Sequence, residues 1–129
     1  MALTNAGRDL IAKMLVGTNA AGEIFNNANA FTHVGDGSTA FAQAQIDMQG
    51  TNKASAAMDA TYPLIAANVL TFRSTFGTGA ANFAWNEWGI KNTASLGSGT
   101  LLNRKVESLG TKTSAQSWQL TTDITVVAT

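Results

Sequence analysis

The strongest constraint on the fold of this chain is the alternation of apolar and polar residues over 68–127. In the clearest run, one face holds Trp118, Leu120, Ile124 and Val126, and the other holds Gln119, Thr121, Asp123 and Thr125. A period of two is typical of antiparallel strands that bury one face. The pattern predicts four strands, separated by glycines and a polar turn: 68–76, 83–91, 100–109 and 117–127.

A short helix is predicted near the N-terminus, over residues 4–16. Thr4 is a suitable N-cap, and Gly17 suits the position just past the last helical residue. Apolar side chains recur at helical spacing between these two positions: Leu10, Ile11, Met14 and Leu15. We expect this stripe to cover one end of the sheet.

The stretch between this helix and the four strands, residues 18–67, is rich in loops. One strand is predicted over 30–34, where a glycine-rich turn at 35–38 ends it. A weaker strand is predicted over 53–58. A further helical turn or two is predicted over 40–48.

These elements together predict the fold class. The chain is expected to be mainly β, with an antiparallel β-sandwich or barrel-like domain and a short N-terminal helix. No shift in composition divides the chain, so residues 1–129 are expected to form a single domain whose β unit spans 68–127.

Charge is scarce in this sequence. Only 12% of the residues are charged, against about 25% in a typical soluble protein, and the formal net charge is +0. Basic residues do not gather into a phosphate-binding patch, so no nucleic-acid partner is expected. No apolar stretch approaches the length of a membrane span, so no membrane partner is expected either. A neutral surface does not repel further copies of the same chain.

No combination of residues in the sequence indicates catalysis. His33 is the only histidine, cysteine is absent, and the acidic residues are dispersed along the chain. A zinc site or a serine triad needs partners that this pattern does not supply, and the glycine pairs lack the lysine of a phosphate loop. We therefore expect no enzymatic activity, no catalytic residues, no cofactor and no metal. His33 is expected to be a surface residue or a satisfied strand residue.

Trp85 and Trp88 lie three residues apart on a predicted strand, so alternation places them on opposite faces. One ring can enter the core, and the other then needs cover from a helix or loop of this chain or from another chain. Tryptophan is enriched in contacts between subunits. An exposed ring could also serve as a platform for a sugar, which leaves a glycan-binding module as a third possibility.

Glu87 shares the predicted face of Trp85. If that face is the core, the carboxylate needs a cationic partner, and Arg104 and Arg73 are the candidates. Arg104 is favoured because its neighbours mark a core-directed face, whereas Arg73 lies on a threonine-rich one. The pairing of Glu87 with Arg104 is therefore predicted.

Four short motifs stand out in the sequence: Leu3-Thr4-Asn5-Ala6-Gly7-Arg8, the stretch 31–37 with Thr39-Ala40 after it, the strand 81–90 and Leu101-Leu102-Asn103-Arg104. They resemble motifs of small virion proteins of tailed bacteriophages, including head decoration (cement) proteins and tail-collar fibre proteins. The resemblance implies a structural protein of the virion, assembled in the cytoplasm of a bacterial host.

Two places in the particle are compatible with this resemblance. As a decoration protein, the chain is expected to form a homotrimer, to contact the major capsid protein and to stabilise the head by bridging capsomers. As a tail-collar, tail-fibre or adaptor component, it is expected to contact other tail proteins instead. A compact, neutral, threonine-rich domain favours the first of these.

Overall fold

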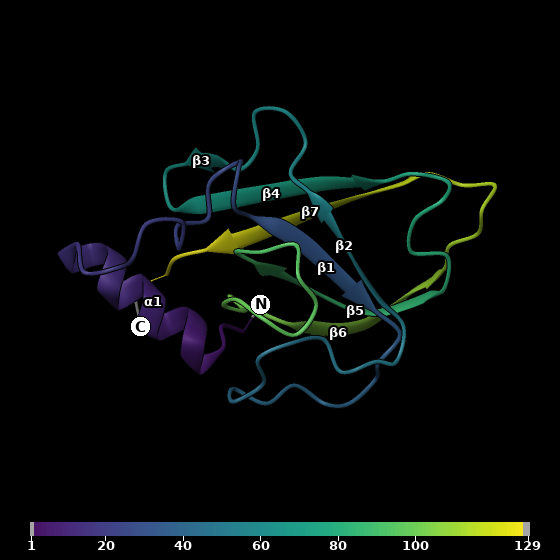
Figure 1. The fold of residues 1–129 in the computed structure, drawn as a ribbon, viewed down its shortest axis with the longest axis horizontal. Helices are drawn as coiled ribbons and strands as arrows, with labels where there is room; N and C mark the ends of the chain where they lie inside the picture. The colour runs from purple at the N-terminus through teal and green to yellow at the C-terminus, as the bar shows by residue number, and fades with distance from the viewer. Residues whose placement is uncertain (1, 128–129) are drawn as a thin grey trace.

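Seven strands form two antiparallel sheets in the computed structural model, which describes residues 2–127 (Figure 1). The first sheet has the strand order β2-β1-β5-β6, and the second has the order β3-β4-β7. The predicted class, mainly β with one short N-terminal helix, is confirmed, and the arrangement resembles a sandwich rather than a closed barrel. The elements are α1 (Asn5–Val16), β1 (Phe31–Gly35), β2 (Lys53–Ala57), β3 (Leu64–Ala66), β4 (Val69–Phe76), β5 (Ala84–Lys91), β6 (Lys105–Thr111) and β7 (Trp118–Thr125).

The four strands predicted from alternation are all present, but they are divided between the two sheets. β4 pairs with β7 along its whole length, whereas β5 and β6 belong to the other sheet. β6 also begins later than predicted. Residues 101–103 make only isolated bridges, from Leu101 to Lys91 and from Asn103 to Leu3.

The strands predicted over 30–34 and 53–58 in the loop-rich stretch are present as β1 and β2, and the structure adds the short strand β3. β1 lies between β2 and β5, and four of its five residues are buried. The helical turn predicted over 40–48 is wrong, because this part forms turns and irregular chain. There the Gln45 side chain accepts from the N–H of Ala42 and donates to the carbonyl of Ala40. These local hydrogen bonds compete with the helical pattern.

The two sheets meet along one edge. Met58, just past β2, forms an isolated bridge to Ser74 of β4, and the N–H of Asp59 donates to the carbonyl of Arg73 over 2.8 Å. Between the layers, the hydroxyl groups of Thr32 and Ser74 lie 2.8 Å apart and satisfy one another. Polar contacts therefore fix how the sheets are aligned.

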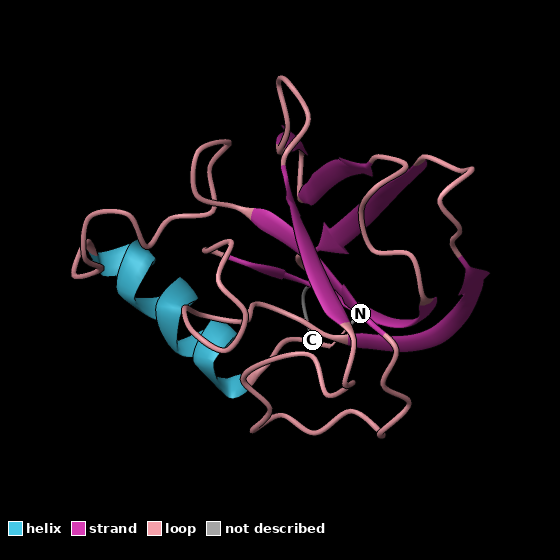
Figure 2. Ribbon diagram, turned by 45° about the vertical axis from the view of Figure 1, so that its right-hand side comes forward, coloured by secondary structure: helices cyan, strands magenta, loops and turns pink. Residues whose placement is uncertain are grey.

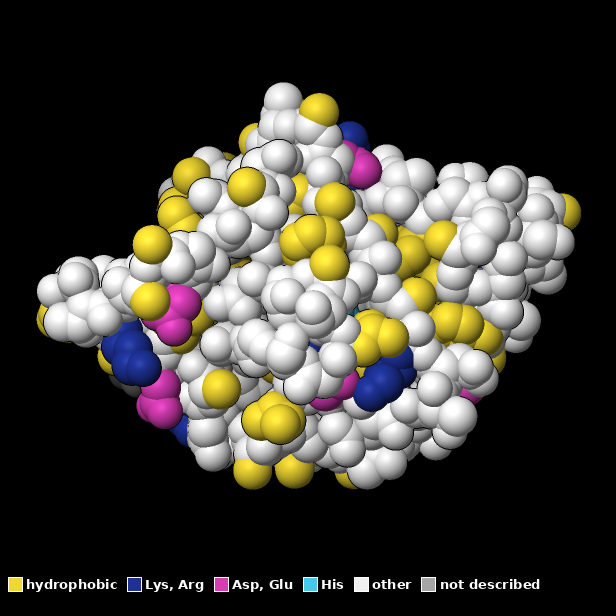
Figure 3. All heavy atoms as spheres, in the orientation of Figure 1, with side chains coloured by type: hydrophobic (Ala, Val, Ile, Leu, Met, Phe, Trp, Pro, Cys, Tyr) yellow, Lys and Arg dark blue, Asp and Glu magenta, His cyan; other side chains and the backbone are white. Residues whose placement is uncertain are grey.

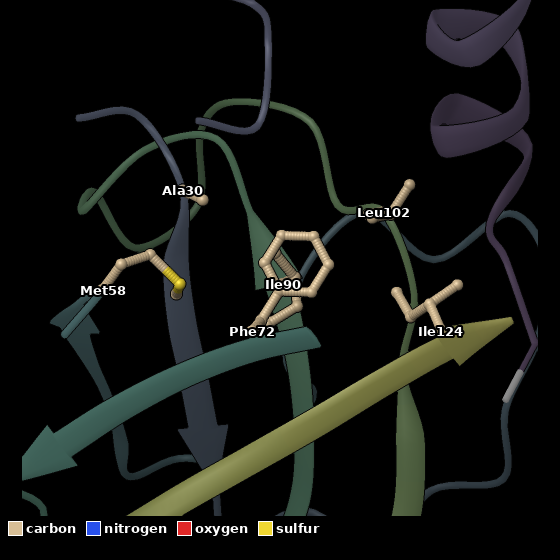
Figure 4. Packing of buried hydrophobic residues seen from close by; sticks show 6 residues of the cluster. All are labelled: Ala30, Met58, Phe72, Ile90, Leu102 and Ile124. Carbon is tan, nitrogen blue, oxygen red and sulfur yellow. The ribbon is translucent and has the colours of Figure 1, made fainter. Parts of the chain in front are cut away.

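The space between the sheets holds the main hydrophobic core, shown in Figure 4. Its buried members are Ala30, Met58, Phe72, Ile90, Leu102 and Ile124. A second buried cluster contains Val34, Phe76, Ala81, Trp85 and Trp88. In β7, Trp118, Leu120 and Ile124 face inward, as alternation predicted.

The helix α1 is docked mainly through its first half, and it lies beside the sheets rather than across them (Figures 1 and 2). Thr4 caps it, as predicted, by accepting from the N–H of Gly7, and Gly17 ends it in the left-handed region at φ 74°. A Cβ on Gly7 would lie 2.5 Å from the carbonyl oxygen of Leu102, so the absence of a side chain allows this close approach. Leu15, however, is 83% exposed. The expectation that the whole apolar stripe would cover the sheet is therefore wrong for its last residue.

Candidate functional site

The predicted ion pair between Glu87 and Arg104 is present, and both side chains are fully buried. Nε and Nη2 of Arg104 each lie 2.7 Å from Oε2 of Glu87. The carboxyl group comes from β5, and the guanidinium from the residue just before β6. An unpaired carboxylate at this depth would be strongly unfavourable, and the guanidinium supplies the opposite charge.

Three backbone N–H groups also converge on Glu87. Gly37 and Gly50 donate to Oε1 over 3.1 and 2.7 Å, and Gln49 donates to Oε2 over 2.8 Å. A Cβ on Gly37 would lie 2.6 Å from Oε1 and 2.5 Å from the nitrogen of Gly50, so glycine is required for this approach. Glu87 therefore fastens both ends of the segment 36–52 to β5.

Arg104 holds the middle of the same segment. Its Nη1 donates to Oε1 of Gln45 over 3.0 Å, and its Nη2 donates to the carbonyl of Thr39 over 2.9 Å. We call Glu87, Arg104 and the segment 36–52 together the buried clamp. Because both carboxyl oxygens accept hydrogen bonds and the side chain is inaccessible, Glu87 has no route to a substrate in this conformation.

The position of Glu87 relative to Trp85 differs from the prediction. The sequence placed both side chains on one face, but Glu87 faces the segment 36–52, whereas Trp85 packs between the sheets against Phe76 and Trp118. The pairing of β5 with β6 shifts register between Trp85 and Glu87. Such an irregularity interrupts strict alternation, which the sequence pattern assumes.

The prediction that the two tryptophans lie on opposite faces is wrong, and the same register shift is the reason. Trp85 and Trp88 belong to one buried cluster, with 1% and 7% of their surface exposed. Nε1 of Trp85 donates to the carbonyl of Ala81 over 2.9 Å, which satisfies its polar group. Neither ring therefore forms an exposed platform for a sugar or a subunit contact on the surface of this chain.

Arg73, the other candidate partner of Glu87, serves the second sheet instead. Its Nε lies 2.8 Å from Oδ2 of Asp59, and its guanidinium lies 4.2 Å from the centre of the Tyr62 ring. This half-buried arrangement fastens the turn that precedes β3. Arg73 and Glu87 are thus in separate networks.

A second charged network lies on the same side of β5 as Glu87, and the sequence analysis did not identify it. Nζ of the fully buried Lys91 donates to Oδ1 of Asp47 over 3.0 Å, and Nζ of Lys53 donates to Oδ2 over 2.9 Å. Burial acts to raise the pKa of Asp47, but the hydrogen bonds from Lys53 and Lys91 outweigh it and hold that pKa below its ordinary value. The available signal was that Glu87, Gly89 and Lys91 are alternate residues of β5 and therefore share one of its faces.

His33 is a buried strand residue rather than a surface one. Its Nε2 lies 2.7 Å from the carbonyl oxygen of Thr93, and its Nδ1 has no hydrogen-bond partner among residues 2–127. Burial lowers the pKa of His33 to about 4, since the charged imidazolium is poorly solvated there. The ring is therefore neutral near pH 7, with its proton on Nε2.

An apolar groove of about 710 Å³ opens between α1 and the end of the second sheet. Exposed aliphatic side chains of β3 and of the chain after β7 border it: Leu64 (45% exposed), Ile65 (73%), Val126 (64%) and Val127 (68%). Sequence reasoning missed this groove. The signal was the adjacent aliphatic pairs at 64–65 and 126–127, because neighbouring residues of a strand cannot both face one core.

Residues 2–127 contain neither a metal-binding cluster nor a membrane-spanning helix. No group of three or more His, Asp or Glu side chains lies close enough together to bind a metal ion. The described part of the chain likewise contains no helix with the length and apolar character needed to span a membrane.

Comparisons of the chain with known protein families, with curated proteins and with solved structures gave no match.

Proposed function

We propose that this chain is a structural protein of a tailed-phage virion, and that it decorates the head and stabilises it by bridging neighbouring capsomers. The proposal starts from the four motifs that resemble small virion proteins. Its partners are then further copies of the chain, in a homotrimer, and the major capsid protein.

The observation that carries the proposal is the apolar groove. Single exposed aliphatic residues are normal on a protein surface, but a groove of this size lined almost entirely by apolar side chains marks a place of interaction. Elsewhere the surface is charge-poor: on the face that Figure 3 shows, charged side chains form small, separate patches. Such a surface suits permanent contacts among many neighbours better than steering of a charged ligand.

The buried clamp supports the same role. Five hydrogen bonds hold the irregular segment 36–52 in one conformation. Glu87 accepts three of them, from the N–H groups of Gly37, Gln49 and Gly50. Arg104 donates the other two, to Gln45 and Thr39. A loop that is already ordered loses little conformational entropy when it forms an interface. A bridging protein gains affinity from this preorganisation.

The proposal is tested by deleting the gene from the phage that encodes the chain. Heads that lack the protein should assemble but release their DNA at a lower temperature than wild-type heads, as measured by dye accessibility during heating. Adding the purified protein back to the deletion particles should restore the wild-type release temperature.

Unchanged head stability, together with a missing or shortened tail structure in electron micrographs, would contradict head decoration. That result would place the chain among tail-collar, tail-fibre or adaptor components, the other position that the resemblance allows.

A further inference from the structure

The edge strands of the two sheets are protected to different degrees. β2 has five residues and its chain continues into the bridge between Met58 and Ser74, and β3 has only three residues. β6 begins with Lys105, and its pairing with β5 shifts register. Short length, lysine and an irregular register keep an edge strand from pairing with another chain. β7 lacks these protections, because its eight residues include neither lysine nor proline and pair with β4 without a break.

The outer edge of β7 carries a row of backbone groups that point away from β4. The N–H of Val126 donates to the carbonyl of Asn68, and the register between the two strands is continuous. Hydrogen-bonded and non-hydrogen-bonded pairs alternate along an antiparallel ladder, so the even-numbered residues of β7 bond to β4. The N–H and C=O groups of the odd-numbered residues therefore face outward: Gln119, Thr121, Asp123 and Thr125. Among residues 2–127, no further strand pairs with this edge, and an extended chain is what satisfies such a row.

The sequence of β7 suits pairing with itself. Opposite residues of an antiparallel pair share a face, and here both must have outward-pointing backbone groups. A pair centred on Thr121 meets both conditions and places Asp123, the only charged residue of β7, opposite Gln119 of the second copy. A pair centred on Thr122 also meets them, but it makes the two Asp123 side chains diagonal neighbours. The register centred on Thr121 therefore keeps the two carboxylates apart.

Apolar side chains near both ends of β7 gain cover in the same register. Trp118 and Leu120 are only half-buried, and Val126, the residue after β7, is 64% exposed. With Thr121 at the centre, Val126 of each copy lies diagonal to Trp118 of the other, within reach of its ring. The net charge of +0 adds no general repulsion between the copies.

We propose that β7 pairs antiparallel with β7 of a second copy, about a two-fold axis at Thr121, so that the second sheets of the two copies become one. Such a contact joins chains in pairs, and it goes beyond the homotrimer proposed above because it can link one trimer to the next. It rests on the geometry of β7 and not on the proposed function. Edge pairing buries less surface than a standard interface, so the dissociation constant is expected at about 0.1–1 mM.

Hydrogen exchange measured by NMR, at protein concentrations below and above this constant, tests the contact without a phage particle. The outward-facing amide protons of Gln119, Thr121 and Asp123 should exchange several-fold more slowly as the concentration rises. The amide protons of Leu120 and Thr122, which are bonded to β4, should be protected throughout. Fast exchange of the three outward-facing amides at every concentration would overturn the inference.

Thr121→Pro tests the contact by mutation. The N–H of Thr121 points outward, so proline removes a donor from the two-fold pair but none from the ladder with β4. Association, measured by sedimentation, should weaken by roughly tenfold to a hundredfold, because both hydrogen bonds at the axis are lost. Thr121→Val is the matched control, since it keeps the N–H and should associate like the wild type. Circular dichroism and urea unfolding verify that both variants fold.

Gln119→Lys tests the register. It places an ammonium group opposite Asp123 of the other copy on both sides of the axis, so association should strengthen by roughly twofold to tenfold. Thr125→Lys adds the same charge to the same face but lies opposite residue 117, so it should not strengthen association. Equal effects of the two variants would refute the register centred on Thr121. A protein whose outward-facing amides stay unprotected, yet whose deletion destabilises heads, would refute this contact and leave the proposed function intact.

Discussion

Several of the few charged residues of this chain lie in its interior. Among residues 2–127, five charged side chains are buried: Asp47, Glu87, Lys91, Arg104 and Lys112. Charged residues are almost never fully buried unless they are paired. Here two ion-paired networks attach irregular segments to β5, so these charges specify which conformation those segments adopt.

Glu87→Gln is expected to destabilise the protein by about 3 kcal/mol, measured by urea unfolding. The amide carries one acceptor oxygen instead of two and leaves the Arg104 guanidinium without a counter-charge in the interior. Glu107→Gln is the matched control, because the exposed Glu107 lies 3.8 Å from an exposed Lys105 and its loss should cost less than about 1 kcal/mol. Equal stability of the two variants would show that the clamp contributes little.

His33 should make the stability of the fold depend on pH between 6.5 and 4. The unfolded residue binds a proton near 6.5 and the folded residue only at about 4, so protonation favours the unfolded chain. The free energy of unfolding should fall by roughly 3 kcal/mol over this interval. The measurement is urea unfolding at several pH values.

His33→Gln is the control for that experiment. Lys91, Asp47 and Lys53 also act on the ring electrostatically. Because folding lowers the pKa of Asp47 from 3.8, protonation of Asp47 changes the stability of the fold only below pH 3.8. The variant should therefore lose most of the dependence between 6.5 and 4. A slope identical to that of the wild type would refute the assignment to His33.

At the scale of elements, hydrogen bonds hold the segment 36–52 as they hold a strand, but without the regular geometry of one. The N–H groups of Gly37, Gln49 and Gly50 are bound to a buried carboxyl group rather than to a neighbouring strand. In hydrogen exchange, these three amide protons should exchange only through openings whose free energy is close to that of global unfolding. Glu87→Gln should remove their protection, whereas the exposed Gly79 should exchange rapidly in both proteins. Rapid exchange of the three amides in the wild type would contradict a rigid segment.

At the scale of the whole molecule, we expect the homotrimer proposed above to form through mainly apolar contacts, because exposed aliphatic side chains gather at the groove beside α1. Sodium chloride up to about 1 M, which screens charges beyond roughly 3 Å, should change the association constant by less than about tenfold. Ammonium sulfate should strengthen association, since excluded salts favour burial of apolar surface. Sedimentation in the two salts checks both expectations. A steep loss of association in sodium chloride would show that charge pairs dominate the contact.

The sequence alone determined the parts of this protein that depend on neighbours along the chain. Alternation located β4, β5 and β7, and the cap residues located α1, because one buried face imposes its period on consecutive side chains. The need of a core carboxylate for a counter-charge also predicted the pairing of Glu87 with Arg104.

Only the tertiary structure decided how those elements combine. The register shift in β5 placed Trp85 and Trp88 in one cluster and turned Glu87 toward the segment 36–52. The division of the strands between two sheets and the groove beside α1 likewise depend on contacts between residues far apart in the chain. Local periodicity carries no information about such contacts, since they are set by how whole layers pack.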